Sequence, residues 1–182
     1  MFAWVVIREE NVDVLPSAIA RAWTGGASVA HLELPAKRAN KPAKQIAVIA
    51  VGGGARGKRE PRWPDVLREW SDINEEPLFP GAELPVLGEE LSALGAQALC
   101  VHAGAGFAQA TVAWYERGAL VGYEHVGGTP VIWDPDGSLG RPLAGATGDS
   151  LIAHALKQIL DQDPPPLDEL AGTFATAPKR PT

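Results

Sequence analysis

Two runs rich in Val, Thr, Trp and Tyr, residues 110–115 and 119–126, carry the clearest pattern in the chain. These residue types suit the pleated, half-buried surface of a strand. Between the runs lies Glu116-Arg117-Gly118, a short turn in which the glycine takes positive φ at no steric cost. The pattern predicts a β-hairpin. Because an isolated hairpin is marginal in water, it also predicts further strands beside this one.

The register of this hairpin depends on its turn. If Arg117-Gly118 is a two-residue turn, Tyr115 faces Leu120, and Val112 faces Tyr123. One face of the sheet then carries Val112, Trp114, Val121 and Tyr123. A three-residue loop would slide the pairing and set Val112 against Gly122, which is a poorer contact. We therefore expect the first register.

Shorter runs predict the other strands. Residues 28–34 alternate apolar with polar, whereas residues 45–51 are apolar on both faces and indicate a strand in the middle of the sheet. Residues 2–7, 97–102 and 129–133 complete the set, and a turn at Pro135-Asp136-Gly137 follows the last of them.

Helical spacing of apolar residues predicts a helix near each end of the chain. The first follows an N-cap at Asp13, carries Leu15, Ile19 and Trp23 on one side, and ends at Gly25-Gly26. The last is capped by Asp149 and has a wide apolar stripe over residues 151–160.

Two more helices are predicted on either side of a proline-containing connector, residues 74–85. The helix before it opens at Pro64-Asp65, and its expected core-facing stripe is Val66, Trp70 and Ile73. The helix after it covers residues 86–95 and is expected to turn Leu87, Leu91 and Leu94 inward.

This order of elements predicts an α+β domain, with three or four helices covering one face of a largely antiparallel sheet of five to seven strands. We expect residues 1–162 to form this single domain and residues 163–182 to form an extended, Pro-rich tail that is loosely held or disordered. With the first strand left out, the order is similar to that of small profilin-like modules, including the roadblock type. That resemblance implies binding to other proteins.

Composition narrows the choice of function. The chain has 182 residues and a formal net charge of −6, which argues against general nucleic-acid binding. Cys100 is the single cysteine, so no intramolecular disulfide can form, which fits a reducing compartment. No apolar run reaches the roughly 20 residues that span a bilayer, and the first residues lack the features of a signal peptide. We expect a cytoplasmic protein without membrane contact, and the Ala, Gly, Pro and Arg bias is typical of a high-GC bacterial genome.

The first candidate site is the Gly-rich segment at residues 52–58, which follows an apolar strand. Its spacing matches the phosphate-binding loop G-x-x-x-x-G-K, with Gly52, Gly57 and Lys58 at the matching positions. In that loop a Ser or Thr follows the Lys and a helix begins at once. Here Arg59 follows, and two prolines obstruct an immediate helix. The other interpretation is a flexible basic loop.

The second candidate site is a group of basic residues with one aromatic residue, Arg56, Arg59, Arg62 and Trp63. An exposed Trp beside Arg is the usual composition of an interface anchor, so these four residues are predicted to bind a partner. The other interpretation of the basic residues is solvated loop charge. Another basic group, at residues 37–44, precedes the 45–51 strand. It is expected at the opposite end of that strand, because seven strand residues span about 23 Å.

The remaining polar residues predict no site of their own. Alternation places Cys100 and His102 on one strand face, where the pair could activate a thiolate, but a lone Cys in an apolar run is more often core filler. The histidines lack metal-ligand spacing, and the acidic turn at residues 134–136 lacks the rest of a calcium loop. The adjacent carboxylates Glu75-Glu76 and Glu89-Glu90 are expected to be solvated. No cofactor is predicted.

The sequence therefore favours a non-catalytic protein–protein interaction module, such as an adaptor, a regulatory subunit or an immunity- or antitoxin-type inhibitor. The expected contact is the patch around Arg62 and Trp63 or a free sheet edge, used for a partner protein or for a homodimer. The alternative is a small-molecule or nucleotide-phosphate binding protein, or an enzyme, that uses the Gly-rich loop at 52–59. Contact with nucleic acid through the two basic loops is a third, less favoured hypothesis.

Overall fold

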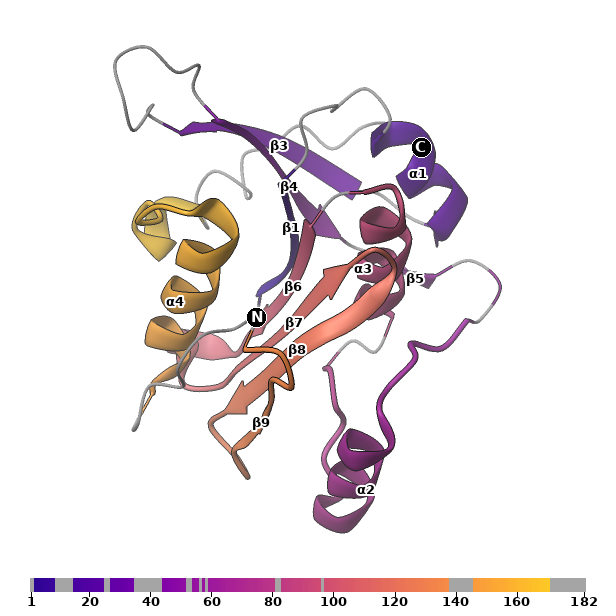
Figure 1. Ribbon diagram of the computed structural model, residues 1–182. Helices are drawn as coiled ribbons and strands as arrows, with labels where there is room; N and C mark the ends of the chain where they lie inside the picture. The colour runs from indigo at the N-terminus through magenta and orange to yellow at the C-terminus, as the bar shows by residue number, and fades with distance from the viewer. Residues whose placement is uncertain are drawn as a thin grey trace.

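A single antiparallel sheet of seven strands organises the fold (Figure 1). The computed structural model describes residues 2–8, 15–24, 27–34, 44–51, 54–55, 57, 59–80, 83–95, 97–137 and 146–170. The strands, in spatial order, are β3 (Ala27–Leu34), β4 (Lys44–Val51), β1 (Phe2–Arg8), β6 (Gln97–Ala103), β7 (Ala110–Glu116), β8 (Ala119–Val126) and β9 (Val131–Trp133). All six pairings between neighbours are antiparallel. The predicted α+β class and the predicted number of strands are confirmed.

Besides a short helical stretch at residues 167–170, four α-helices lie in the described part of the chain. They are α1 (Leu15–Ala22), α2 (Asp65–Asn74), α3 (Leu84–Ala93) and α4 (Gly148–Leu160), and a short 3₁₀ turn, η3 (Ala105–Phe107), joins β6 to β7. Helix α1 ends earlier than predicted, because the next two residues form β2 (Trp23–Thr24) and pair with β5 (Gly54–Ala55). The predicted cap Asp13 lies outside the described residues, as do Gly25 and Gly26.

Strand β1 lies in the interior of the sheet, between β4 and β6. Its residues pair along their whole length with β6, from Phe2 opposite Ala103 to Arg8 opposite Gln97. The resemblance to profilin-like modules was stated without β1. That resemblance therefore concerns only the order of the other elements. Strand β4, predicted as an inner strand, has β3 on one side and β1 on the other.

Helices cover both faces of the sheet, and the expectation that they cover one face is wrong. Helix α4 packs on one face against a core that includes Trp4, Leu99 and Trp114. Helices α1 and α3 pack on the other face, against a second core that includes Val5, Cys100 and Tyr115. Figure 1 shows α4 on one side of the sheet and α1 and α3 on the opposite side. The inner strands are apolar on both faces for this reason.

The β7–β8 hairpin has the predicted two-residue turn. Tyr115 pairs with Leu120, and Arg117 and Gly118 both have positive φ, of 50° and 79°. Two consecutive positive φ values define the turn type whose twist matches that of antiparallel strands.

Beyond the turn, a bulge between Trp114 and Tyr115 shifts the register by one residue. Val112 therefore pairs with Glu124, and the predicted pairing of Val112 with Tyr123 is wrong. Tyr123 lies in the core on the α3 side, while Val112 and Trp114 lie in the core under α4. A one-residue slip exchanges the two faces of a strand, so this one bulge places the Tyr123 ring on the opposite face of the sheet from Val112.

The last helix is capped by Thr147 rather than by the predicted Asp149. Thr147 and Ser150 form a reciprocal capping box, and Asp149 lies in the first turn. After the helix, Leu170 is buried against the α4 core and Leu167 packs at its edge. Within residues 163–170 these two leucines are packed, whereas Asp163, Asp168 and Glu169 are exposed, and the rest of the predicted tail, residues 171–182, lies outside the described residues.

Candidate partner-binding surface

The Gly-rich segment is described only in part. Gly52, Arg56 and Lys58 lie outside the described residues. Gly57 is exposed, has a φ of 76°, and a Cβ built on it would meet nothing within 4 Å. Downstream, α2 begins only at Asp65, and residues 59–64 are not helical. A helix N-terminus directly after the Lys, which a phosphate loop uses to hold its anion, is therefore not formed by residues 59–64.

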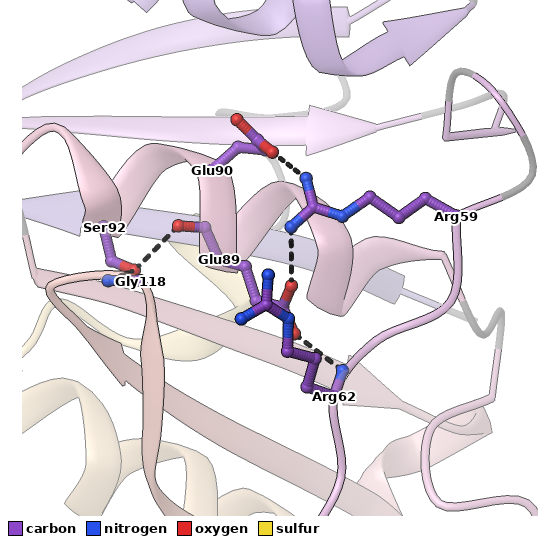
Figure 2. Close-up of polar contacts among 6 residues, drawn as sticks. All are labelled: Arg59, Arg62, Glu89, Glu90, Ser92 and Gly118. Atoms are coloured by element: carbon purple, nitrogen blue, oxygen red, sulfur yellow. Dashed lines mark hydrogen bonds and ion pairs between the residues drawn. The ribbon is translucent and has the colours of Figure 1, made fainter.

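Arg59 is held by two carboxylates of α3 (Figure 2). Its Nη2 donates to Oε2 of Glu89 at 3.1 Å, and its Nη1 donates to Glu90. The second oxygen of Glu89 accepts the backbone N–H of Arg62 at 2.8 Å. Only 4% of the Glu89 side chain is exposed, so the expectation that this carboxylate is solvated is wrong. Arg59 therefore anchors the segment that leads into α2.

The burial of Glu89 was not predicted because its charge was considered without the apolar residues of the helix that carries it. Helix α3 is buried nearly all round, over residues 84–89 and again at Leu91 and Ser92. Pro85, Val86, Leu87 and Gly88 precede Glu89, and a helix that is apolar on most sides is a buried helix. A carboxylate in such a helix needs a cation and hydrogen-bond donors.

The same helix is also tied to the β7–β8 turn. Ser92 Oγ accepts the N–H of Gly118 at 3.0 Å and donates to the carbonyl of Glu89 at 3.1 Å (Figure 2). The predicted inward set on this helix is correct for Leu87 and Leu91 but wrong for Leu94, which is 45% exposed at the C-cap. Helix α3 is thus a fixed support for both neighbouring segments.

Trp63 is half-buried rather than free in a loop. Its ring meets that of Tyr123 edge-on, with centroids 5.7 Å apart, and it packs against the core on the α3 side. The Arg62 side chain is exposed. Of the four residues predicted to bind a partner, Arg59 is thus engaged within the chain, Trp63 is partly covered, and Arg62 is open to a partner.

Helix α2 carries apolar side chains on its exposed side. Val66 is 56% exposed and Ile73 is 79% exposed, whereas Leu67 between them is 1% exposed. The predicted core-facing stripe is therefore wrong at Val66 and Ile73, and Leu67 supplies the buried contact instead. Figure 1 shows why: α2 projects away from the sheet and from the other helices. Trp70 packs partly against the core and lies between the two exposed residues on the helix surface.

Contacts at both ends hold α2 to the body. Before it, Arg59 is bound as described above. After it, Glu75 takes the left-handed conformation at the C-cap, and Glu76 Oε1 accepts the N–H of Thr129 at 3.2 Å. The other oxygen of Glu76 lies 3.6 Å from Nε2 of His125. The helix is thus a positioned element of the fold.

An open cleft of about 260 Å³ lies beside α2. Its lining residues are Trp63, Arg68, Ser71, Asp72, Pro77, Leu78 and Phe79. Leu78 and Phe79 are buried at its floor, and Tyr123 donates its hydroxyl hydrogen to the carbonyl of Leu78. On the helix surface, Arg68 and Asp72 face away from Val66 and Ile73, so the cleft and the exposed apolar side chains are separate surfaces.

A row of polar side chains crosses the sheet beneath this region. His102 pairs with Thr111, Thr111 pairs with His125, and Thr111 Oγ1 and His125 Nδ1 share a hydrogen bond of 2.8 Å. With Glu76 beside His125, the order hydroxyl, imidazole, carboxylate is that of a nucleophilic triad. Thr111 is only 1% exposed, so a substrate does not reach its hydroxyl in this structure. The row is buried, and Nε2 of both histidines has no hydrogen-bond partner among the described residues.

Burial sets the charge states in this row. Desolvation lowers the pKa of His102, helped by the nearby His125. Desolvation also lowers the pKa of His125, against a smaller opposing effect of Glu76. On the opposite face, desolvation raises the pKa of Glu124, and His154 partly offsets this. Both histidines are therefore held neutral near pH 7.

Cys100 lies on the same strand face as His102, as predicted, but under α3. Its side chain is fully buried, and Sγ lies 3.6 Å from the carbonyl oxygen of Leu84. Desolvation raises the pKa of this thiol well above its usual range, which disfavours the thiolate. Such a cysteine fills the core and does not act as a nucleophile.

Within the described ranges, no three His, Cys, Asp or Glu side chains are grouped so that they could hold a metal ion. None of the helices in those ranges has the length and apolarity needed to cross a bilayer. Comparison with protein-family models, with curated proteins and with solved structures finds no match. Function has to be inferred from the side chains themselves.

Proposed function

We propose that this chain is a non-catalytic protein–protein interaction module that binds its partner with the exposed side of α2. The observation that carries the proposal is the exposure of Val66 and Ile73 on a helix that is held at both ends. The two residues are seven positions apart, two helical turns, and therefore lie on the same side of α2. We call Val66, Trp70 and Ile73 the α2 stripe.

Single exposed apolar residues are common and need no explanation, but a contiguous group on one element marks an interaction surface. Covering a Val or Ile side chain contributes roughly 1.5–3 kcal/mol. The half-buried Trp70 extends the stripe, and Trp residues often dominate the energy of an interface. Arg62, just before α2, is also exposed.

The polar residues of the described chain support a non-catalytic role. Glu89 holds Arg59, Thr111 and Cys100 are buried, and Glu76 secures the residues after α2. Each of these groups has a structural partner or no access to solvent. The exposed apolar surface of α2 has no such internal explanation.

The proposal is tested by removing the apolar surface without touching the core. A V66S/I73S double variant and an Ile132→Ser control would be compared with the wild type as affinity baits in the native host. Ile132 is also an exposed apolar residue, 46% exposed, but lies on β9. We expect the double variant to keep the wild-type unfolding temperature and to lose a bound protein that the wild type and Ile132→Ser retain. Retention of the same protein by all three baits would contradict the proposal.

A further inference from the structure

We infer that the partner presents an amphipathic helix whose apolar side is bordered by Lys or Arg side chains. This inference rests on the proposed function, because it names the occupant of the α2 stripe. It goes further by specifying the charge and the secondary structure of that occupant.

The charge on α2 supports basic borders. Three exposed carboxylates, Asp65, Glu69 and Asp72, share the helix with one guanidinium, that of Arg68, which leaves a net charge of −2. Arg68 is already ion-paired with Asp65. Asp72 faces away from the stripe, so the acidic border is formed by Glu69, which lies three positions from Val66 and four from Ile73 and borders both on the helix surface.

The shape of the stripe supports a helical occupant. Val66 and Ile73 are separated by about 10 Å along the axis of α2 and form a narrow line with Trp70. A line of apolar side chains with this spacing fits the groove of a second helix that lies alongside. In such a pair, the acidic border of α2 faces the residues that flank the apolar side of the partner helix.

A second copy of this chain fits less well. Two α2 helices packed against each other through their stripes would bring the Glu69 carboxylates of the two copies close together. Like charges at an interface select against such pairing. The formal net charge of −6 adds long-range repulsion between copies. The charge on α2 therefore favours a basic partner over self-association.

The test uses the full chain and three fluorescein-labelled synthetic peptides. Each is about 18 residues long, so that a helix can form. All three have the same Leu stripe and differ only in flanking residues, which are Lys, Gln or Glu. Affinity is measured by fluorescence anisotropy at low and high salt. We expect the Lys peptide to bind about tenfold more tightly than the Glu peptide at low salt, with the difference shrinking at high salt.

Two variants with the same change in net charge locate the effect. Glu69→Lys should reduce the preference for the Lys peptide to about twofold or less. Asp136→Lys, in the exposed turn after β9, should leave the preference at its wild-type value. V66S/I73S should weaken binding of all three peptides about tenfold or more.

Each other outcome overturns the inference in a distinguishable way. Equal binding of the three peptides means that the stripe binds through apolar contact alone, so the acidic border has no role. An equal loss of preference in Glu69→Lys and Asp136→Lys means that only net charge matters. Absence of peptide binding, while V66S/I73S still loses the captured protein, means that the partner is not a basic helix although the proposed function stands. Undiminished peptide binding by V66S/I73S places the peptides elsewhere and also counts against the proposed function.

Discussion

Glu89 accepts a hydrogen bond from Arg59 across the gap between α3 and the segment that leads into α2, at 3.1 Å. The carboxylate is buried while the guanidinium is partly exposed. A buried carboxylate that loses its cation keeps its desolvation cost without compensation. This pair therefore fixes where α2 begins, and with it the position of the α2 stripe.

Arg59→Ala should lower the free energy of unfolding by about 1–3 kcal/mol, a value reduced from that of a fully buried pair because Arg59 is partly exposed. Glu90→Ala is the matched control, since it removes the other carboxylate from the same guanidinium but leaves no buried charge behind. We expect that control to cost about 0–1 kcal/mol. Equal costs in urea denaturation would show that Glu89 does not depend on Arg59.

Gly88→Ala should destabilise the fold even though alanine is the better helix former. A Cβ at this position would lie 2.6 Å from Sγ of Cys100 and 2.8 Å from Cδ2 of Tyr115. Overpacking of this kind typically costs about 1–3 kcal/mol. In the Gly88→Ala/Cys100→Ala double variant one clash is relieved, so its cost should be less than the sum of the single costs. Strict additivity would contradict the close approach of α3 to the sheet.

Cys100 should resist alkylation in the folded chain. Burial both excludes the reagent and raises the pKa of the thiol. N-ethylmaleimide labelling followed by mass spectrometry should show modification only in denaturant. Ile73→Cys provides the control, because its thiol at an exposed position of α2 should react readily under native conditions. Fast native labelling at both positions would show that α3 opens and exposes Cys100. Slow labelling at both would show that position 73 on α2 is covered.

Acid should destabilise the fold through its buried histidines. The folded-state pKa values of His102 and His125 are lowered by desolvation, so the unfolded chain takes up protons first as the pH falls. Stability is therefore unaffected by these groups well above pH 6.5 and declines below it, by at most about 1.4 kcal/mol per pH unit for each group. Glu124 acts in the opposite sense, because burial raises its pKa.

His102→Leu isolates one of these contributions. This variant should show a shallower loss of unfolding free energy between about pH 7 and pH 5 than the wild type, because one proton fewer is taken up on unfolding. Denaturant titrations at several pH values measure the difference. The same slope in both proteins would mean that His102 binds its proton equally well in the folded and the unfolded chain.

Much of the sheet could be predicted from alternation and turn chemistry. The hairpin turn at Arg117-Gly118 follows from local residue types, and local rules predict local structure well. The bulge after Trp114 could not be predicted, since the register that it produces sets Val112 opposite the polar Glu124, whereas the expected register set it opposite an apolar Tyr123. Burial of β1 in the middle of the sheet was missed because strand order is a long-range property that no local pattern encodes.

The exposure of Val66 and Ile73 was mispredicted for a related reason. Periodicity identified Val66, Trp70 and Ile73 as one stripe but assigned it to the core, because an amphipathic helix in a globular protein usually turns its apolar side inward. The pattern shows which residues share a side and does not show whether the rest of the chain covers that side. Leu67 is the residue of α2 that is fully buried, and Trp70 packs partly against the core beside it.

The central claim is that the α2 stripe contacts a protein partner, and site-specific photo-cross-linking tests it most directly. A photoreactive amino acid would be placed at position 73 and, in a separate chain, at position 132 on β9, both in the native host. We expect a discrete cross-linked protein at position 73, none at position 132, and loss of the position 73 adduct when Val66→Ser is added. No adduct at position 73, or the same adduct at both positions, would contradict the account.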